Sequence, residues 1–141
     1  MKVEVFQSVP EQARKIRQEV FVEEQGFQNE FDATDHRAVH FVAFDDAEKP
    51  IGTCRVFFDP ERNSYVLGRL AVRKESRGQK IGERMVEKAE EYVCKMGGAE
   101  LQLHAQCRVQ GFYQKLGFSA FGDIGDDEGC PHIWMRLALQ K

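Results

Sequence analysis

Long apolar runs, paired cysteines and a large excess of either charge are all missing from this 141-residue sequence. No stretch approaches the ~18 consecutive apolar residues of a membrane-spanning helix. The start, from Met1 to Phe6, alternates like a strand and lacks the apolar core of a secretory signal. A net charge of −3 offers no general attraction for nucleic acid or anionic lipid. We therefore expect a cytoplasmic protein that binds neither nucleic acid nor membrane.

Cysteine is sparse and scattered. The four cysteines are Cys54, Cys94, Cys107 and Cys130. No Cys-x-x-Cys pair is present, which argues against a zinc site and against a disulfide scaffold. We expect four reduced thiols, most of them buried, and no metal. The length and the 42% hydrophobic content fit one globular domain over residues 1–141, with a single core.

One basic, glycine-containing turn stands out against this weakly acidic background. Residues 70–85 read as a strand, a turn and a helix, and the turn and helix start carry five cations within twelve residues: Arg73, Lys74, Arg77, Lys80 and Arg84. N–H groups at a helix start lack partners and carry the positive end of the helix dipole. Gly78 and Gly82 would let a ligand approach closely. The pattern predicts a pyrophosphate site, with a solvated basic helix start as the alternative, and its glycine spacing fits neither a P-loop nor a Rossmann turn.

Hydrophobic periodicity predicts the element order β α β β β α β α β β. The expected strands cover residues 2–7, 39–44, 51–58, 65–72, 101–105, 118–121 and 132–139. A helical crossover precedes residues 101–105, so this strand should run parallel to residues 65–72. The acidic run Asp123–Gly129 is expected to form a turn-rich loop. The predicted fold class is α/β of the α+β type, with a mixed, mostly antiparallel sheet of about seven strands flanked by helices.

This element order, with the basic turn at its centre, resembles the GNAT superfamily of acetyl-CoA-dependent N-acetyltransferases. The superfamily signature is Arg or Gln, two residues, Gly, one residue, then Gly or Ala. Arg77 opens it and Gly82 closes it here, but Lys80 stands where the middle glycine is usual. Residues 111–118, Gly-Phe-Tyr-Gln-Lys-Leu-Gly-Phe, are similar to the Phe-Tyr-x-Lys-x-Gly-Phe that follows the fifth strand in this superfamily.

A third stretch narrows the resemblance to the small bacterial ElaA-like branch. It comprises residues 16–25, continued by 30–35, with Pro-His-Ile-Trp-Met at 131–135. The resemblance then covers nearly the whole chain, which is expected to be a single N-acetyltransferase domain. It also implies a fifth strand that diverges from the fourth, with the pantetheine arm of CoA in the gap.

The resemblance implies which residues hold acetyl-CoA. Backbone groups of one strand would pair with the arm, and amides of the turn would hold the pyrophosphate: these are Leu70, Ala71, Val72, and then Arg77, Gly78, Gln79, Lys80, Ile81 and Gly82. Gln106 stands where many members have an Asn that bonds the arm. Tyr113 takes the place of the Tyr that protonates the departing thiolate, although a half-buried aromatic with an ordinary hydrogen bond is the alternative.

The sequence does not identify a general base. Some relatives place a Glu early in the fourth strand, but residues 65–68 offer no carboxylate. The remaining candidates are Glu24, Asp32, Asp35, His36 and His104. His104 and Cys107 suggest a thiol nucleophile with an imidazole partner, but a strand histidine and a buried thiol are commoner. The acidic segment 23–35 would attract a cationic acceptor such as a polyamine, an amino sugar or a lysine-like amine, with a solvated loop as the alternative.

The predicted function is therefore direct transfer of an acetyl group from acetyl-CoA to a primary amine of a small molecule or peptide, by a monomer or homodimer. Such transfer needs an uncharged amine, a donor for the carbonyl oxygen and a proton for the leaving sulfur. A backbone N–H on residues 70–72 would serve the carbonyl. The alternatives are a non-catalytic domain that senses or sequesters acyl-CoA and a protein-interaction module.

Overall fold

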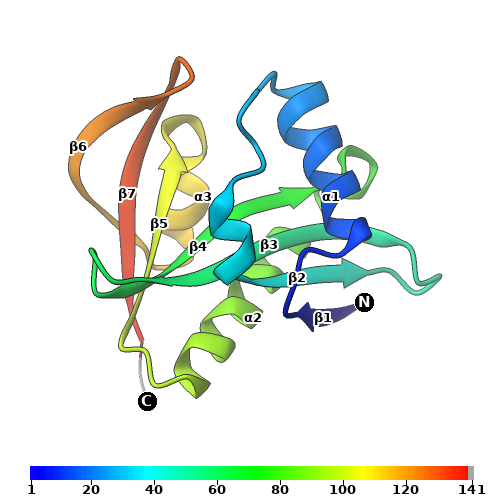
Figure 1. Ribbon diagram of the computed structural model, residues 1–141, viewed down its shortest axis with the longest axis horizontal. Helices are drawn as coiled ribbons and strands as arrows, with labels where there is room; N and C mark the ends of the chain where they lie inside the picture. Colours follow the sequence, from blue (N-terminus) through cyan, green and yellow to red (C-terminus); the bar gives the residue numbers. More distant parts are fainter. Residues whose placement is uncertain (140–141) are drawn as a thin grey trace.

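A seven-stranded sheet forms the centre of the computed structural model, which describes residues 1–139 (Figure 1). The strands are β1 (Lys2–Phe6), β2 (Val39–Phe44), β3 (Pro50–Asp59), β4 (Ser64–Val72), β5 (Glu100–Gln106), β6 (Ser119–Asp127) and β7 (Cys130–Ala138). The α-helices are α1 (Glu11–Arg17), α2 (Ile81–Lys95) and α3 (Gln110–Lys115). The strand order is β1-β2-β3-β4-β5-β7-β6, with β4 and β5 parallel and the other neighbours antiparallel. The predicted fold class and the predicted parallel pair are both confirmed.

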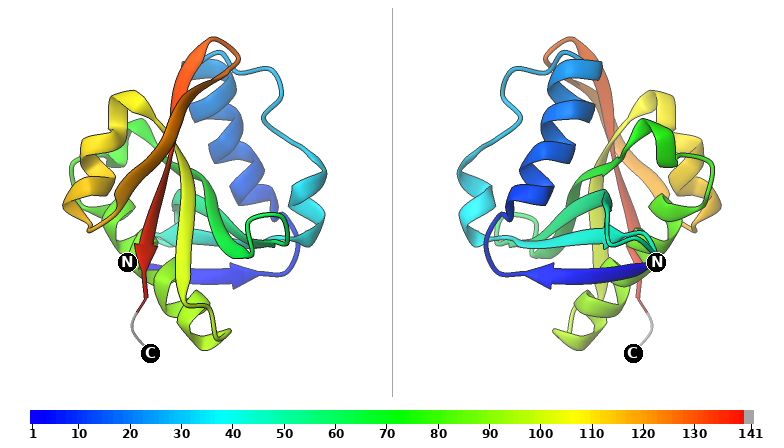
Figure 2. Two further views of the ribbon diagram at one scale, coloured as in Figure 1. Left: turned by 90° about the vertical axis from the view of Figure 1, so that its left-hand side faces the viewer. Right: turned by 90° about the vertical axis from the view of Figure 1, so that its right-hand side faces the viewer.

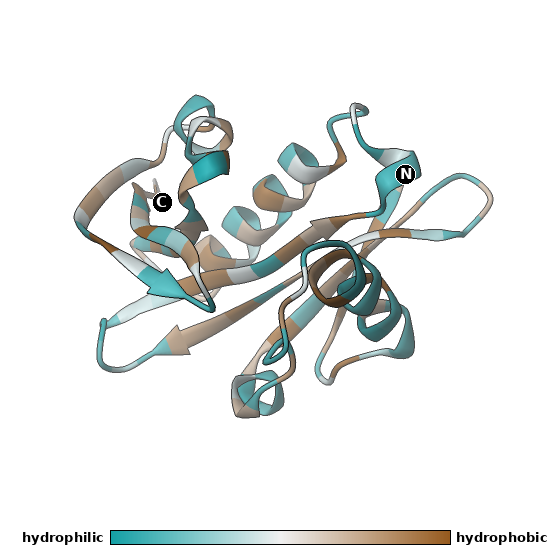
Figure 3. Cartoon of the chain, turned by 90° about the horizontal axis from the view of Figure 1, so that it is seen from above, coloured by the Kyte–Doolittle hydropathy of each residue, from teal (hydrophilic) through white to brown (hydrophobic). Residues whose placement is uncertain are grey.

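Helices cover both faces of the sheet (Figure 2). Strand alternation decides which side chains face which helix. Leu101, Leu103 and Ala105 of β5 join the main core with α2, whereas His104 between them belongs to the opposite face, where α1 lies. Figure 3 shows hydrophobic segments along the central strands and hydrophilic outer turns on the helices. Within residues 1–139, no helix combines the length and the apolarity needed to cross a membrane.

The parallel strands β4 and β5 diverge after a short stretch of pairing. β4 and β5 pair at Tyr65 with Leu101, and their pairing ends at Leu67 with Leu103, although β4 runs on to Val72. The register of β4 against β3 shifts at this point, and Arg69 takes a left-handed conformation with φ 54°. Figure 1 shows the two ribbons diverging. The gap implied by the family resemblance is thereby confirmed.

The expectation of a loop at Asp123–Gly129 is wrong. β6 continues through Asp127, because Gly125 pairs with His132 and Asp127 with Cys130 after an irregularity in the ladder. The acidic side chains stay exposed because β6 is an edge strand, where charge is tolerated and discourages pairing with another chain. Only the two-residue turn at Glu128 and Gly129 interrupts the hairpin, and both residues have positive φ.

The expectation that most cysteines are buried is also wrong. Cys54 is buried in β3, where burial strongly raises the pKa of its thiol. Cys94, Cys107 and Cys130 are partly exposed. Cys94 lies in the last turn of α2, Cys107 directly follows β5, and Cys130 is the first residue of β7. Reactive-thiol chemistry is therefore not favoured at Cys54, because the thiolate is the reactive form.

The segment of residues 25–38 is held against the sheet by a buried ion network. Arg17 of α1, only 1% exposed, donates to Glu30 Oε2 at 2.8 Å and to Asp35 Oδ1 at 2.9 Å. Arg55 of β3 donates to the same Asp35 oxygen at 2.9 Å. Two arginines from different elements thus share carboxylates from one irregular segment. This network explains how a polar stretch with little regular structure keeps a defined path over the sheet.

The carboxylates of the acidic segment 23–35 are largely occupied by the protein's own arginines. Asp32 accepts from Arg55, and its Oδ2 lies 3.3 Å from Arg69 Nη2. Glu24 forms a two-pronged ion pair with Arg77, with both contacts at 2.8 Å. The segment is therefore neither a solvated loop nor a free anionic surface. Attraction of a cationic acceptor requires other acidic groups.

Candidate functional site

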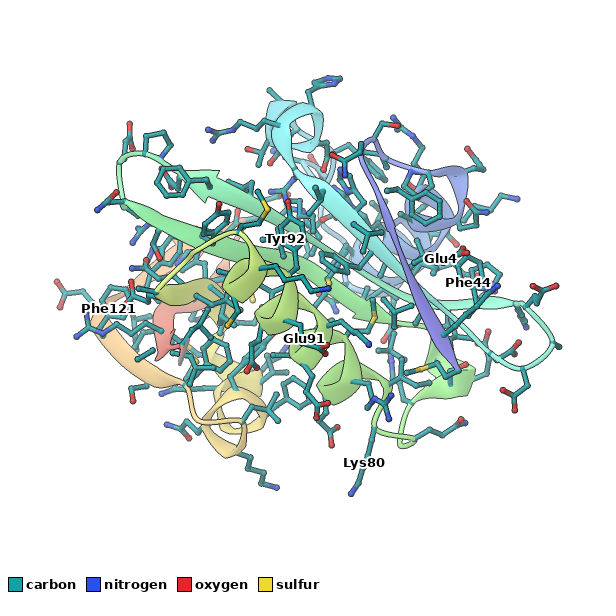
Figure 4. All side chains as sticks on the ribbon, turned by 90° about the horizontal axis from the view of Figure 1, so that it is seen from below. Glu4, Phe44, Lys80, Glu91, Tyr92 and Phe121 are labelled. Atoms are coloured by element: carbon teal, nitrogen blue, oxygen red, sulfur yellow. The ribbon has the colours of Figure 1, made fainter. Side chains whose placement is uncertain are left out.

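The predicted phosphate turn is a compact bend that ends in the first residue of α2. The helix begins at Ile81, and its N-cap is Lys80, whose φ of 62° lies in the left-handed region. Gly78 also has a positive φ, of 82°. Lys80 therefore takes the backbone conformation that a glycine adopts without cost, at the position where the superfamily signature has glycine. Its side chain extends away from the body of the molecule (Figure 4).

The conformation of Lys80 predicts a stability difference between two substitutions. A left-handed residue with a Cβ costs roughly 1–2 kcal/mol. Lys80→Gly should remove this cost and raise the free energy of unfolding by up to about 1 kcal/mol after the entropy loss of glycine. Lys80→Ala removes the same charge but keeps the strain, so it is the matched control. Urea denaturation of both variants measures the difference, and equal stability would show that Lys80 is unstrained.

The cations around the turn are not equally available to a ligand. Arg77 is engaged by Glu24 and donates to the Val72 carbonyl at 3.0 Å. Arg73 binds Glu19 at 2.9 Å and also reaches a second carboxylate, that of its neighbour two residues on. Lys80 is exposed and lines the same cavity as Arg77. A ligand at the turn can therefore bind the backbone amides and Lys80 directly. To bind Arg77 it must compete with Glu24.

A cavity of about 540 Å³ lies at the start of α2, between the turn and α3. We call it the turn cavity. It is lined by Leu70, Val72, Ser76, Arg77, Gly78, Lys80, Ile81, Gly82, Glu83, Val109, Phe112 and Tyr113. All of the predicted cofactor-binding residues line it except Ala71, Gln79 and Gln106. Ala71 is buried against α1 on the other face of the sheet, so only its backbone is placed to serve a ligand. A Cβ on Gly82 would lie 3.2 Å from the Phe112 ring, so this glycine permits close packing of α2 on α3.

A second cavity, of about 170 Å³, lies in the gap between the diverging strands and is also lined by the segment that follows α1. We call it the strand cleft. Its walls include Phe21, Gln25, Phe27, Asn29, Glu30, Leu67, Arg69, Leu70, Leu103, His104, Ala105, Gln106, Arg108, Val109, Tyr113, Asp127, Glu128 and His132. Leu70, Val109 and Tyr113 line both cavities. The two cavities therefore adjoin at these three residues, one of which is Tyr113.

Tyr113 lies at this junction and is 9% exposed. Its ring packs edge-on against Phe112 and Phe118, at centroid distances of 5.0 and 5.9 Å. Burial, and to a smaller degree the nearby Cys54 thiol, raises the pKa of the Tyr113 phenol. The hydroxyl therefore stays protonated across the physiological range. A group in this state can donate a proton or a hydrogen bond and is unsuited to be a base.

Gln106 lies on the α1 side of the gap. Its side chain donates to Gln25 at 2.9 Å and accepts from Arg108 Nε at 2.7 Å. The amide lines the strand cleft and a neighbouring cavity of about 400 Å³, and it is not part of the turn cavity wall. A bond from Gln106 to a pantetheine arm remains a prediction, and it would compete with these two partners.

Most of the predicted base candidates are poorly suited to that role. The hydrogen bond from Arg77 lowers the pKa of Glu24. Burial opposes ionisation of Asp32 and Asp35, but hydrogen bonds from buried arginines outweigh it and lower the pKa of both. His36 is exposed on the short turn Ala33–Arg37 and lies outside the walls of both cavities. His104 is the one candidate whose ring faces the strand cleft without such a partner among residues 1–139.

His104 belongs to an aromatic group rather than to a pair with Cys107. Its ring stacks on Trp134 at 4.7 Å and lies 4.9 Å from the His132 ring. Partial burial of the ring lowers the pKa of His104, and the electrostatic effects of its neighbours His132 and Arg62 lower it further. Within residues 1–139, no hydrogen bond or ring contact joins His104 to Cys107. The arrangement gives no support to a thiol nucleophile.

Three groups in the strand cleft have no counterpart among the predicted site residues. Glu30 is 4% exposed, and burial raises its pKa against the opposing effects of Arg69 and Arg17. Glu128 accepts backbone hydrogen bonds from residues 28 and 29 at 2.9 and 3.0 Å, which ties the β6–β7 turn to the segment after α1. His132 is 6% exposed. The Pro-His-Ile-Trp-Met stretch marked His132 in the sequence, but no local pattern indicated that β7 would bring it to the gap.

Comparison with known proteins supports the same family as the motifs. The family model described as an acetyltransferase (GNAT) domain matches residues 6–139. YyaT of Bacillus subtilis is 31% identical over 135 residues, covering 92% of this chain and 89% of YyaT. The crystal structure of an acyl-CoA N-acyltransferase from Pseudomonas aeruginosa superposes with a TM-score of 0.81 at 26% identity, over 96% of this chain and 97% of that one.

ElaA of Escherichia coli connects the chain to the branch suggested by its third motif. ElaA is 33% identical over 79 residues, which span 55% of this chain and 51% of ElaA. Its crystal structure covers 96% of this chain and 97% of its own, with a TM-score of 0.81 and 23% identity. The sequence match and the structural match therefore agree on an ElaA-like relative.

Proposed function

This chain belongs to the GNAT acetyltransferase family and is an acyltransferase of the ElaA-like kind, and from that premise we propose that it transfers an acetyl group from acetyl-CoA directly to a primary amine. The observation that carries the proposal is the junction of the two cavities at Tyr113. A thioester reaching the gap from the turn cavity would meet an acceptor entering from the α1 side. No covalent enzyme intermediate is needed, because the two substrates approach one point from opposite faces of the sheet.

The turn cavity suits the diphosphate and arm of CoA. The amides from Arg77 to Gly82 surround the N-terminus of α2, where backbone N–H groups and the helix dipole favour an anion. Lys80 adds a positive charge on the same wall. Leu70 and Val72 present strand backbone that β5 does not pair, since pairing ends at Leu67. We propose that the arm pairs with this free strand edge and that one of its N–H groups polarises the thioester carbonyl.

Tyr113 is the proposed proton donor for the leaving sulfur. It is buried at the meeting point of the cavities and stays protonated at neutral pH. A thiolate with an ordinary thiol pKa near 8.5 is a better leaving group when a proton reaches it as the carbon–sulfur bond breaks. Tyr113 would also accept the restoring proton from solvent through the open cleft.

A cationic amine is the acceptor that the cleft mouth favours. Asp127 and Glu128 line the strand cleft from the β6–β7 hairpin, and Glu128 uses its carboxylate to bind backbone amides without an arginine partner. These charges lie outside the arginine network that neutralises the acidic segment. They would draw an ammonium group toward the gap.

Release of free thiol from acetyl-CoA, measured with a diamine, an amino sugar and a lysine-containing peptide, tests the proposal. Amine-dependent release with at least one of these acceptors is expected. CoA should also raise the melting temperature, because a ligand that binds only the folded state must stabilise it. Tight CoA binding without release for any amine would favour a sensing domain instead. Absence of both effects would favour an interaction module.

A further inference from the structure

His132 is placed at the reaction gap by strand pairing. It pairs with Gln106, the last residue of β5, so the two residues share the α1 face of the sheet. Its side chain is 6% exposed and lines the strand cleft together with Tyr113. Tyr113 belongs to the core on the opposite face. The histidine and the tyrosine therefore approach the gap from the two sides from which acceptor and thioester would enter.

The hydrogen bond of His132 determines which of its ring nitrogens is free. Nδ1 lies 2.8 Å from the carbonyl oxygen of Cys130, and a carbonyl oxygen only accepts. In the neutral ring Nδ1 therefore carries the hydrogen, and Nε2 carries a lone pair. The Phe27 ring packs edge-on at 6.5 Å and His104 lies at 4.9 Å, so neighbours on both elements restrict the ring plane.

We propose that His132 is the general base of the acetyl transfer and that its Nε2 removes a proton from the acceptor ammonium. This inference rests on the proposed function. It identifies one base where the sequence left several candidates, and it selects a residue outside that set. Among the cleft residues, the carboxylates of Glu30 and Glu128 are already engaged by arginines or by backbone amides, and that of Asp127 is exposed on the edge strand β6. Only the two histidines then offer an imidazole lone pair, and His132 is the one whose tautomer is imposed by the backbone.

The proton balance of the reaction is complete with these groups. Nε2 of His132 takes one proton from the ammonium, and the freed amine nitrogen forms a bond to the thioester carbon. As the tetrahedral intermediate collapses, the carbon–sulfur bond breaks, and the sulfur gains the proton of the Tyr113 hydroxyl. The nitrogen loses its second proton, which restores Tyr113 through water. His132 then releases the first proton to solvent, so the net products are the amide, free CoA and one proton.

Charged groups of both signs surround the His132 ring. His104 faces it from β5, Asp127 and Glu128 from the β6–β7 hairpin, and Glu30, Arg69 and Arg108 from the remaining walls of the cleft. The acid limb of the pH–activity profile therefore depends on His132 together with these charged neighbours. A variant that changes only His132 isolates its share.

His132→Asn is the test variant, because its side-chain amide can keep the donor to the Cys130 carbonyl while removing the basic nitrogen. With the probe amine that gives the fastest wild-type thiol release, kcat at neutral pH should fall by about 10²–10⁴-fold, the usual contribution of a general base. The rate of the variant should then climb steadily with pH, as the amine loses its proton without help. The stabilisation by CoA should stay unchanged. His36→Asn is the control, because His36 is exposed and lies outside the walls of both cavities, and its kcat should stay within a few-fold of wild type. His104→Asn is measured beside it, because His104 is the other histidine of the strand cleft.

Each outcome of this experiment decides the question. A wild-type pH profile and kcat in His132→Asn, with His104→Asn strongly impaired, would overturn the assignment in favour of His104. Equal loss in both variants with an unchanged pH profile would assign both histidines to structure. If His132→Asn does not fold, His132→Gln is measured in the same way. Failure of the proposed function has a different signature, because the wild-type protein itself would then release no thiol with any probe amine.

Discussion

Replacing Tyr113 by Phe is expected to lower kcat by about 10²–10⁴-fold while leaving the stabilisation by CoA almost unchanged. The ring makes its contacts with Phe112 and Phe118 through carbon atoms, so phenylalanine preserves the packing. Only the hydroxyl is lost, and with it the proton for the leaving sulfur. Steady-state thiol release measures kcat, and the shift in melting temperature with CoA measures binding.

Tyr92→Phe is the matched control for this variant. Tyr92 lies on α2 and packs edge-on against Phe41 at 5.8 Å, away from the junction of the cavities. Its loss should change neither kcat nor CoA binding. Wild-type activity in Tyr113→Phe would remove this hydroxyl from the mechanism. A thioester with a leaving thiol of lower pKa should also suffer less from the mutation, since a better leaving group depends less on the acid.

Arg17→Met is expected to lower the free energy of unfolding by about 3–5 kcal/mol, the usual cost of removing one partner from a buried ion pair. Arg17 is almost fully buried and binds Glu30 at 2.8 Å and Asp35 at 2.9 Å. Methionine fills similar space but leaves the Glu30 carboxylate with Arg69 as its remaining ion partner. The Phe31 ring also loses the guanidinium 4.7 Å from its centre. Urea denaturation followed by circular dichroism measures the loss.

Lys15→Met serves as the control for Arg17→Met, because Lys15 is an exposed cation on the same helix. Exposed charges away from buried networks usually change stability by less than about 0.5 kcal/mol. Similar losses in the two variants would mean that the helix responds to charge in general. Combining Arg17→Met with Glu30→Gln should recover part of the loss, because the double variant no longer buries a carboxylate that has lost one of its two arginine partners.

Local patterns in the sequence were sufficient for the parts of the fold built from regular elements. The strand-like run Val39–Phe44 predicts β2 with the bounds that the structure has. The crossover through α2 predicts that β5 runs parallel to β4. Arg77 and Gly82 mark a turn whose walls form a cavity at the start of α2. These features depend on residues that are close in sequence, which is why a single chain reveals them.

The features that the sequence did not reveal depend on distant partners or on departures from regular geometry. The π-helical turn Gln18–Glu24 extends α1 without any change in hydrophobic period. The second half of β6 exists only because β7 pairs with it, despite three acidic residues in its last five positions. Arg17 and Asp35 are 18 residues apart, and nothing local shows that they meet. His132 likewise reaches the gap only because β7 pairs with β5.

The early end of the β4–β5 ladder has a mechanical consequence. Just three residue pairs join strands β1 to β4 with strands β5 to β7. The sheet therefore consists of two parts that are connected by a short stretch of pairing between β4 and β5. A substrate arm hydrogen-bonded along the free edge of β4 would extend this pairing beyond Leu67. We expect amide exchange at residues 68–72 to slow on CoA binding, because the ligand would then supply the hydrogen-bond partner that β5 does not provide there.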